Sequence, residues 1–282
     1  MEKVSIIGAG VMGMGIAQAL AQQGFEVAVC DLERSIIERS LERTRKNLES
    51  LVNREKITAQ EAEEIISRIK QTTNVEDISA ADLIIEAASE NMEVKKQVFV
   101  QLDGLCPATT ILASNTSTLS PTEIASATKR PDKVIGMHWF NPAPVMRLIE
   151  VVVSAETSEE TVQAVMEFSR RVGKTPVRVN EAPGGIVSRI LRGYLNVAVD
   201  VLAEGVATVE DIDTAMKLGA NFPMGPFELI DLIGVDIHTI NSDALARELG
   251  DLKYRPHAFL RKMVRAGHLG RKTGRGFYNY TE

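Results

Sequence analysis

Val4-Ser-Ile-Ile-Gly-Ala-Gly-Val-Met-Gly13 joins a short apolar run to three glycines, and a helix-like stretch, Met12–Gln23, follows. The glycines have the spacing G-x-G-x-x-G between a strand and a helix. In such a turn the first glycine permits the tight bend, the second lets the backbone approach a pyrophosphate, and the third lets the helix pack on the strand. We therefore expect Gly8, Gly10 and Gly13 to bind a dinucleotide at the helix N-terminus.

An acid, Asp31, ends the second apolar run, Val27–Cys30. A carboxylate in this place accepts hydrogen bonds from a ribose 2′-hydroxyl and repels a 2′-phosphate, which predicts NAD as the cofactor. NADP stays possible because Arg34 lies close in sequence and could accept a phosphate. The alternative without a cofactor is a glycine-rich turn beside a surface acid.

Strand and helix signals alternate through the first part of the chain, which predicts an α/β fold with a Rossmann-type, doubly wound, mostly parallel sheet. The charged stretch Glu33–Lys70 is too long for one crossover, so we expect a helical hairpin that stands off the sheet. The predicted strands are Val4–Ile7, Val27–Cys30, Leu83–Ile85, Ile111–Ala113, Val134–Met137 and Leu148–Val153, and the predicted helices are Met12–Gln23, Ile36–Val52, Ala59–Ile69, Val94–Leu105 and Glu159–Val172.

The pattern changes around Asn180–Gly185 (N-E-A-P-G-G), after which almost no strand signal occurs. We expect an NAD-binding domain over residues 1–183, hairpin included, and an all-helical C-terminal substrate and dimerisation domain over residues 184–282. The many apolar positions of the helical part favour a homodimer formed through it. Its predicted helices are Ile186–Ala203, one that begins with a capping box at Thr208, Phe227–Leu232, Ile237–Leu249 and Ala258–Ala266.

Composition narrows the class of protein. The formal net charge of −6 argues against nucleic acid as a partner, and no run of 18 apolar residues predicts a membrane span. A strand that begins within three residues of the N-terminus leaves no room for a signal peptide, so we expect a cytoplasmic protein. The two cysteines, Cys30 and Cys106, are expected to be small buried hydrophobic residues rather than redox groups.

Candidate catalytic residues lie at the ends of predicted strands, where open α/β sheets build their sites. They occur in Ser114-Asn-Thr-Ser-Thr118, in Gly136-Met-His-Trp-Phe-Asn-Pro142 and at Glu150. A neutral imidazole at His138 can take a proton from an alcohol. Glu150 follows far enough along the chain for a turn and a return, and its carboxylate would orient the ring. The alternative is a core histidine beside an exposed acid.

Over essentially its whole length the chain resembles the L-3-hydroxyacyl-CoA dehydrogenase family, most closely the bacterial 3-hydroxybutyryl-CoA dehydrogenases. The motifs that carry the resemblance are I-I-G-A-G-V-M-G-M-G-I-A, I-E-A-A-S-E-N-M-E-V-K-K, A-S-N-T-S-T-L, G-M-H-W-F-N-P-A-P-V-M-R-L-I-E-V, D-I-D-T-A-M-K-L-G-A-N-F-P-M-G-P and G-R-K-T-G-R-G-F-Y.

The resemblance implies hydride transfer between NAD and a 3-hydroxyacyl-CoA held in the cleft between the domains, and no metal ion is expected. His138 would be the general base, Glu150 its orienting partner and Ser117 a hydrogen-bond donor to the 3-oxygen near the nicotinamide. The further positions implied are Glu90, Lys95, Asn115, Asn141 and Lys272 for the cofactor or its surroundings, and Asn47, Arg54 and Lys56 for coenzyme A. From spacing alone, Lys95 and Lys272 could equally be solvated surface charges.

The chain departs from the family pattern after the domain boundary. Where members usually read P-G-F-V-V-N-R-I-L, this chain reads Pro183-Gly-Gly-Ile-Val-Ser-Arg-Ile-Leu191. Further on, Arg192–Val197 replaces an apolar, proline-containing stretch that ends in Asn-Glu. Ser188 replaces an asparagine that helps to bind the reacting carbonyl region, and it is kept as a catalytic candidate. Gly185 replaces a phenylalanine, which would widen the acyl pocket or loosen the hinge.

These departures leave two alternatives open. One is the same chemistry on another substrate, such as a bulkier or more polar thioester, a carrier-protein thioester or a free hydroxy acid. The other is a non-catalytic NAD-binding protein, which the retention of Ser117, His138 and Glu150 disfavours.

Overall fold

The apolar runs of the N-terminal part form one eight-stranded sheet in the computed structural model, which describes residues 1–280. The chain divides after Gly185 into two units, each described by itself. The strands of the first unit are β1 (Val4–Ile7), β2 (Val27–Cys30), β3 (Ile69–Thr72), β4 (Leu83–Glu86), β5 (Ile111–Ser114), β6 (Val134–Trp139), β7 (Leu148–Val153) and β8 (Thr175–Asn180).

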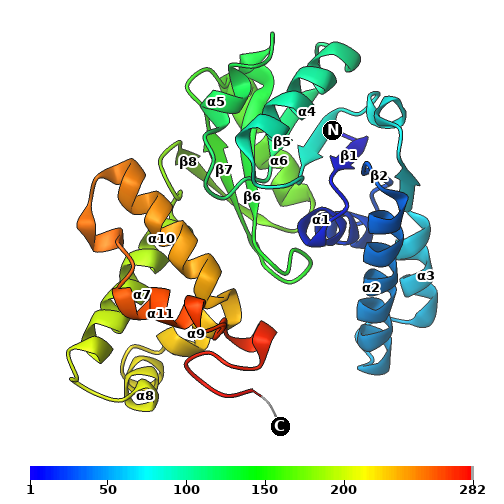
Figure 1. The fold of residues 1–282 in the computed structure, drawn as a ribbon. Helices are drawn as coiled ribbons and strands as arrows, with labels where there is room; N and C mark the ends of the chain where they lie inside the picture. Colours follow the sequence, from blue (N-terminus) through cyan, green and yellow to red (C-terminus); the bar gives the residue numbers. More distant parts are fainter. Residues whose placement is uncertain (281–282) are drawn as a thin grey trace. The chain divides into compact units, whose positions relative to one another are not determined.

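The strand order is β3-β2-β1-β4-β5-β6-β7-β8, and every neighbouring pair is parallel except β6 and β7. The predicted mostly parallel, doubly wound sheet is therefore confirmed. Helices lie between the strands along the chain (Figure 1): α1 (Val11–Gln22), α2 (Arg34–Asn53), α3 (Ala59–Ser67), α4 (Met92–Leu105), α5 (Pro121–Ala125) and α6 (Glu159–Arg171), with short 3-10 turns η1 (Val75–Ile78) and η2 (Pro131–Lys133).

Both faces of the sheet are buried, which explains why its central strands read as unbroken apolar runs. Ile6 of β1 packs in one cluster with residues of α1 and α6, whereas its neighbour Ile7 packs in a second cluster with Phe99 of α4 and Ile124 of α5. Successive residues of a strand point to opposite faces. A strand covered on both sides therefore needs apolar residues at every position.

Two strands, β3 and β8, are absent from the prediction, and they form the two edges of the sheet. Their sequences, Ile-Lys-Gln-Thr and Thr-Pro-Val-Arg-Val-Asn, mix polar with apolar residues because much of each strand faces solvent. The predicted helix Ala59–Ile69 ends at Ser67, and the last residue assigned to it begins β3. In the interior of the sheet, β6 runs two residues beyond the predicted Met137, so His138 lies inside the strand.

The charged stretch after β2 folds into two helices, α2 and α3, that lie side by side (Figure 1). A capping box at Thr58 and Glu61 begins α3. Both helices contact α1, and their apolar side chains, such as Leu48 and Ile65, belong to the same buried cluster as those of α1. The hairpin is therefore packed through one face and leaves its charges on the other.

The second unit is all-helical, as predicted. Its helices are α7 (Val187–Ala203), α8 (Val209–Gly219), α9 (Pro226–Ile233), α10 (Val235–Leu249) and α11 (Ala258–Arg265), with 3-10 turns η3 (Leu252–Tyr254) and η4 (Arg271–Thr273). Buried Asp213 accepts hydrogen bonds from the backbone N–H groups of Phe227 and Glu228 and so caps α9. Within residues 1–280 no helix combines the length and apolarity needed to cross a membrane.

Candidate active site

His138 and Glu150 face each other across the antiparallel pair β6 and β7, where the ladder sets them in register. His138 Nδ1 lies 2.9 Å from Glu150 Oε2. Their exposed fractions are 8% and 1%, so the alternative of an exposed acid is wrong. Directly opposed residues of two strands point to the same face of the sheet. The chain therefore turns after His138 and returns to place Glu150, twelve residues later, beside it, as predicted.

The contact at Nδ1 leaves the other ring nitrogen of His138 for chemistry. A neutral imidazole that donates from Nδ1 to the carboxylate has an unprotonated Nε2, which can accept a proton. No residue among 1–280 forms a hydrogen bond with Nε2. The Phe140 ring lies 4.4 Å from the imidazole between ring centroids and covers one side of it. The pair can therefore act as a general base with an orienting acid.

The three glycines of the turn have different steric roles. A Cβ on Gly8, whose φ is +97°, would lie 2.6 Å from the Ala87 carbonyl group, and one on Gly13 would lie 1.8 Å from the Gly8 carbonyl oxygen. A Cβ on Gly10 would meet nothing within 4 Å. Gly8 and Gly13 are thus required for packing, while Gly10 leaves open space above the turn.

Helix α1 begins directly after Gly10 with no side-chain cap and no acid in its first turn. Its first backbone N–H groups and the positive end of its dipole are therefore available to an anion. Together with the open side of Gly10, this end of α1 fits the pyrophosphate of a dinucleotide.

A pocket of about 440 Å³ adjoins the turn and is lined mostly by small and apolar side chains, among them Ile36 and Val94. Asp31 also lines it and is not the surface acid of the alternative reading, because its Oδ2 accepts a hydrogen bond of 2.7 Å from the Ala9 N–H. No lysine or arginine is among the described residues that line the pocket, and Arg34 is paired with Glu38. The pocket therefore has the shape and charge for an adenosine with a free 2′-hydroxyl.

Asp31→Ser should weaken NADH binding by about 10- to 100-fold, the range for a lost charge-assisted hydrogen bond, and should reduce discrimination against NADPH. Fluorescence titration with both cofactors measures this. Glu33→Ser removes the same charge two residues away and serves as the control. A wild-type protein that binds NADPH more tightly than NADH would contradict the prediction.

Lys95 of α4 is 1% exposed, so the alternative of a solvated surface charge is wrong. Its Nζ lies 2.8 and 3.0 Å from the two carboxylate oxygens of Glu86 and 3.3 Å from Glu90 Oε2. Ser114 donates a further hydrogen bond to Glu86. The Lys95 ammonium group therefore forms ion pairs with two carboxylates of the protein, Glu86 and Glu90.

Glu90 holds the loop that carries Ser117. Its Oε1 accepts hydrogen bonds from the Thr116 hydroxyl at 2.6 Å and from the Ser117 and Thr118 N–H groups at 3.1 and 3.3 Å. Burial opposes ionisation of Glu90, but Lys95 and these hydrogen bonds outweigh it, so the pKa of Glu90 lies below its ordinary value. Glu90 and Lys95 therefore position the Ser117 loop.

The two remaining residues predicted near the cofactor in this unit, Asn115 and Asn141, differ in their surroundings. Asn115 Oδ1 accepts a hydrogen bond of 2.9 Å from the Trp139 N–H and ties the end of β5 to the end of β6. Asn141 is exposed in the loop after β6. Sequence reasoning did not identify Glu86, although an acid at the end of an apolar strand, with a lysine nine residues later, is a usable signal.

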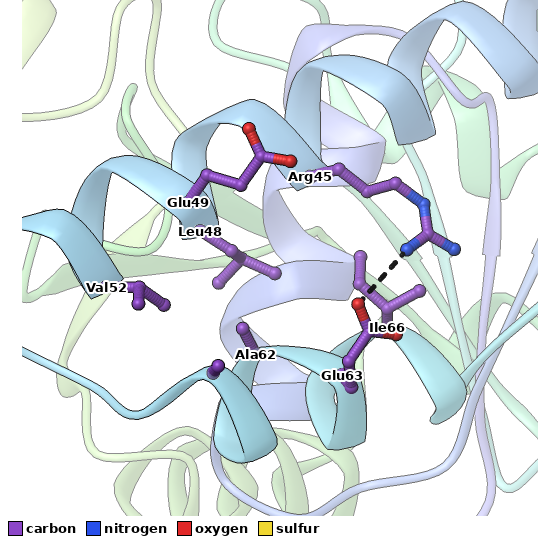
Figure 2. Close-up of a pocket in the computed structure, with 8 residues that line it drawn as sticks. Arg45, Leu48, Glu49, Val52, Ala62, Glu63 and Ile66 are labelled. Carbon is purple, nitrogen blue, oxygen red and sulfur yellow. Dashed lines mark ion pairs between the residues drawn. The ribbon is translucent and has the colours of Figure 1, made fainter.

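The residues predicted for coenzyme A, Asn47, Arg54 and Lys56, are exposed on α2 and in the turn after it. Within residues 1–280 neither cation forms an ion pair, so both can meet phosphates. A separate groove of about 150 Å³ lies between α2 and α3 (Figure 2). Its lining, which includes the Arg45–Glu63 ion pair, contains none of the three predicted residues.

Two predicted residues lie in the second unit. Ser188 is half-buried in the first turn of α7. Lys272, in η4, is bound by Asp236 of α10, with Nζ 2.6 and 2.7 Å from its carboxylate oxygens. Lys272 is thus held in place by an acid of its own unit.

Gly185 has a left-handed backbone, with φ of +54°, and a Cβ there would lie 2.8 Å from Glu150 Oε2. A phenylalanine therefore cannot refill an acyl pocket at this backbone geometry without moving the acid of the dyad. Gly185 therefore packs against the Glu150 carboxylate, while its predicted effect on the acyl pocket or the hinge stays a prediction.

Gly185→Ala should lower turnover by displacing the Glu150 carboxylate from His138. Gly250→Ala is the matched control, because Gly250 has a similar φ of +63° but a Cβ there would meet nothing within 4 Å. Both variants carry the left-handed backbone penalty of about 1–2 kcal/mol, so comparable losses in thermal stability are expected. Equal turnover in the two variants would rule out the contact with Glu150.

Comparisons with known proteins agree with the site. The profile for "3-hydroxyacyl-CoA dehydrogenase, NAD binding domain" matches residues 3–182, and that for the C-terminal domain of the same family matches residues 184–280. A 3-hydroxybutyryl-CoA dehydrogenase of Clostridioides difficile is 51% identical over 99% of this chain and 100% of that protein. A probable 3-hydroxybutyryl-CoA dehydrogenase of Bacillus subtilis is 47% identical over 100% and 98%.

Among solved structures, an (S)-3-hydroxybutyryl-CoA dehydrogenase from Ralstonia eutropha superposes with a TM-score of 0.95 at 44% identity, covering 100% of both chains. The resemblance predicted from the motifs is confirmed. The chain belongs to the 3-hydroxyacyl-CoA dehydrogenase family of NAD-dependent oxidoreductases.

Proposed function

We propose that this protein interconverts 3-hydroxybutyryl-CoA and acetoacetyl-CoA with NAD. The observation that carries the proposal is the buried pair of His138 and Glu150, in the same sheet that presents the glycine turn to a dinucleotide. The four-carbon substrate is supported by full-length relatives of that name at about half identity.

In the oxidation, His138 Nε2 takes the proton of the 3-hydroxyl group as C3 becomes a carbonyl carbon. NAD, held by the glycine turn and Asp31, would supply the acceptor for the hydride from C3. Glu150 stabilises the imidazolium and keeps the ring in the orientation that presents Nε2. Ser117, on the loop held by Glu90, donates a hydrogen bond to the 3-oxygen. In the reverse reaction His138 returns the proton to that oxygen.

The proposal includes further binding roles for the predicted site residues. The turn shaped by Gly8 and Gly13 binds the pyrophosphate above Gly10, and Asp31 binds the adenosine ribose. Glu90, Lys95, Asn115 and Asn141 shape the nicotinamide end, and Lys272 completes the cofactor contacts. Ser188 hydrogen-bonds the acyl carbonyl region, and Asn47, Arg54 and Lys56 bind coenzyme A. Three observations support these roles. The N-terminus of α1 has no side-chain cap, and a pocket adjoins Asp31. The Arg54 and Lys56 side chains are exposed at the end of α2.

We propose a homodimer formed through the helical unit, because apolar side chains such as Ile190, Val197 and Ile240 are exposed there. Both cysteines are free and buried, which fits work in a reducing cytoplasm. Burial, with Asp31 and Asp77, raises the pKa of Cys30 to about 11, so this thiol stays protonated and unreactive.

A steady-state assay with acetoacetyl-CoA and NADH tests the proposal, with NADPH, free acetoacetate and an acetoacetyl carrier protein as comparisons. We expect turnover with acetoacetyl-CoA and NADH to exceed each comparison. Absence of turnover with any 3-ketoacyl-CoA would refute the proposed function. Higher turnover with the free acid or the carrier-protein thioester would reassign the substrate.

A further inference from the structure

The segment that follows β8 begins with an acid, Glu181, whose carboxylate binds the start of α5. Its Oε2 accepts a hydrogen bond of 2.9 Å from the Thr122 N–H and a second one from the Thr122 hydroxyl. Its Oε1 accepts a hydrogen bond from the hydroxyl of Ser120, the residue that caps α5. Both carboxylate oxygens of Glu181 are therefore bonded to the segment in which α5 begins.

The backbone of Glu181 is itself fixed to the sheet. Its N–H donates a hydrogen bond of 3.1 Å to the Val153 carbonyl oxygen, directly after β8 ends at Asn180. The Thr122 hydroxyl oxygen also accepts a hydrogen bond of 2.9 Å from the Ala155 N–H, in the turn after β7. Glu181 thus ties the start of α5 to the ends of two strands of the sheet.

The start of α5 is also the far end of the loop that carries Ser117. This loop joins β5 to α5, and Glu90 holds its first part by the hydrogen bonds from Thr116 onward that are described above. Glu181 holds its last part at Ser120. Two acids from widely separated parts of the chain therefore fix the two ends of one short loop, and Ser117 lies between them.

Attachment at both ends matters because packing does not fix the middle of the loop. The side chains of Ser117, Thr118 and Leu119 are only partly buried. The Ser117 hydroxyl has no hydrogen-bond partner among residues 1–280, so it is free to donate to a substrate. A catalytic contact made from a loop depends on supporting hydrogen bonds, and a displacement of about 1 Å can cost about 10²-fold in rate.

We propose that Glu181 is a positioning residue of the reaction, because it fixes the second end of the loop from which Ser117 donates to the 3-oxygen. The inference rests on the proposed function, which assigns that hydrogen bond to Ser117. Negative charge develops on the 3-oxygen as the ketone is reduced, so the hydrogen bond strengthens towards the transition state. A displaced Ser117 therefore lowers kcat more than it raises KM.

Glu181→Gln tests the inference, because the amide has only one oxygen and presents an NH₂ group to the remaining donors. We expect kcat for acetoacetyl-CoA with NADH to fall by about 10- to 100-fold, with KM and NADH affinity changed by less than about twofold. Glu181→Asp keeps two acceptor oxygens and should restore part of the lost kcat. A wild-type kcat in Glu181→Gln overturns the inference.

A second background, Ser117→Ala, separates positioning of Ser117 from a general structural effect. This background lacks the hydroxyl that Glu181 is inferred to position, so the addition of Glu181→Gln should lower kcat no further. The same fold-loss of kcat in the wild-type and Ser117→Ala backgrounds would show that Glu181 acts on some other group, and it overturns the inference.

Asp103→Asn is the matched control, because this acid of α4 holds the chain beyond the other end of α5. Asp103 accepts hydrogen bonds from the Lys129 N–H at 2.9 Å and from Arg130 Nε–H at 2.6 Å. Asp103→Asn should lower the unfolding temperature, as Glu181→Gln does, but should leave kcat near the wild-type value. Equal losses of kcat in the two variants overturn the inference.

Thr122→Val provides a second variant in case Glu181→Gln does not fold. It removes one hydroxyl donor and keeps the backbone contact with Glu181, so kcat should fall in the same direction by a smaller factor. An unchanged kcat in Thr122→Val overturns the inference in that case. Failure of the proposed function is distinct, because the wild-type protein would then not reduce acetoacetyl-CoA at all.

Discussion

Replacement of His138 by glutamine should lower kcat by about 10²- to 10⁴-fold, the usual contribution of a general acid–base group. Glutamine keeps a polar side chain of similar reach but cannot accept and return a proton near neutral pH. NADH affinity should barely change, because the glycine turn and the Asp31 pocket lie at other strand ends. Steady-state kinetics and NADH titration measure the two quantities.

Glu150→Gln should show a related loss of kcat, since the two side chains act as a unit and their effects do not add. His268→Gln controls for the loss of a histidine at a position with no side-chain hydrogen bond within residues 1–280. Near-wild-type turnover in His138→Gln would place the catalytic base elsewhere.

Lys95→Met should lower the free energy of unfolding by about 3–5 kcal/mol, because it leaves the buried Glu86 carboxylate without its cation. Glu86 is fully buried and lies 2.8 Å from the ammonium group, so water cannot replace the lysine. Urea unfolding measures the loss. We also expect lower turnover, because Lys95 and Glu90 together hold the loop of Ser117.

Lys96→Met is the matched control, since the neighbouring Lys96 pairs with Glu123 near the surface, where water screens the pair and its loss should hardly change stability. The double variant Lys95→Met/Glu86→Gln should recover part of the stability, because it removes the uncompensated charge. Equal effects of Lys95→Met and Lys96→Met would show that the ion pair with Glu86 is unimportant.

Local sequence was sufficient where one segment carries the whole signal. The turn from Gly8 to Gly13 was predicted because the steric demands of a strand, a tight bend and a helix are met within ten residues. The central strands were predicted because burial on both faces requires unbroken apolar runs. The return from His138 to Glu150 was predicted because a hairpin of two strands is itself a local structure.

Local sequence was insufficient where a residue's environment comes from distant segments. The edge strands β3 and β8 lack an unbroken apolar run, and their pairing with neighbouring strands makes them part of the sheet. Lys95 has the composition of a surface residue, but Glu86 and Glu90 converge on it from β4 and the loop that follows. Burial of a charge depends on the groups that replace its water, and no spacing rule supplies them.

By itself, then, the sequence determined the six central strands of the sheet, the dinucleotide turn, the helical second unit and the family. The tertiary structure decided which side chains are buried and what they contact: Lys95 against two acids, Glu150 against Gly185, and Arg192 of α7 against His238 of α10. The physical reason is the distance along the chain over which each kind of interaction acts. Strand, turn and helix preferences act between near neighbours in the chain, whereas burial and electrostatic pairing act between residues that only the fold brings together.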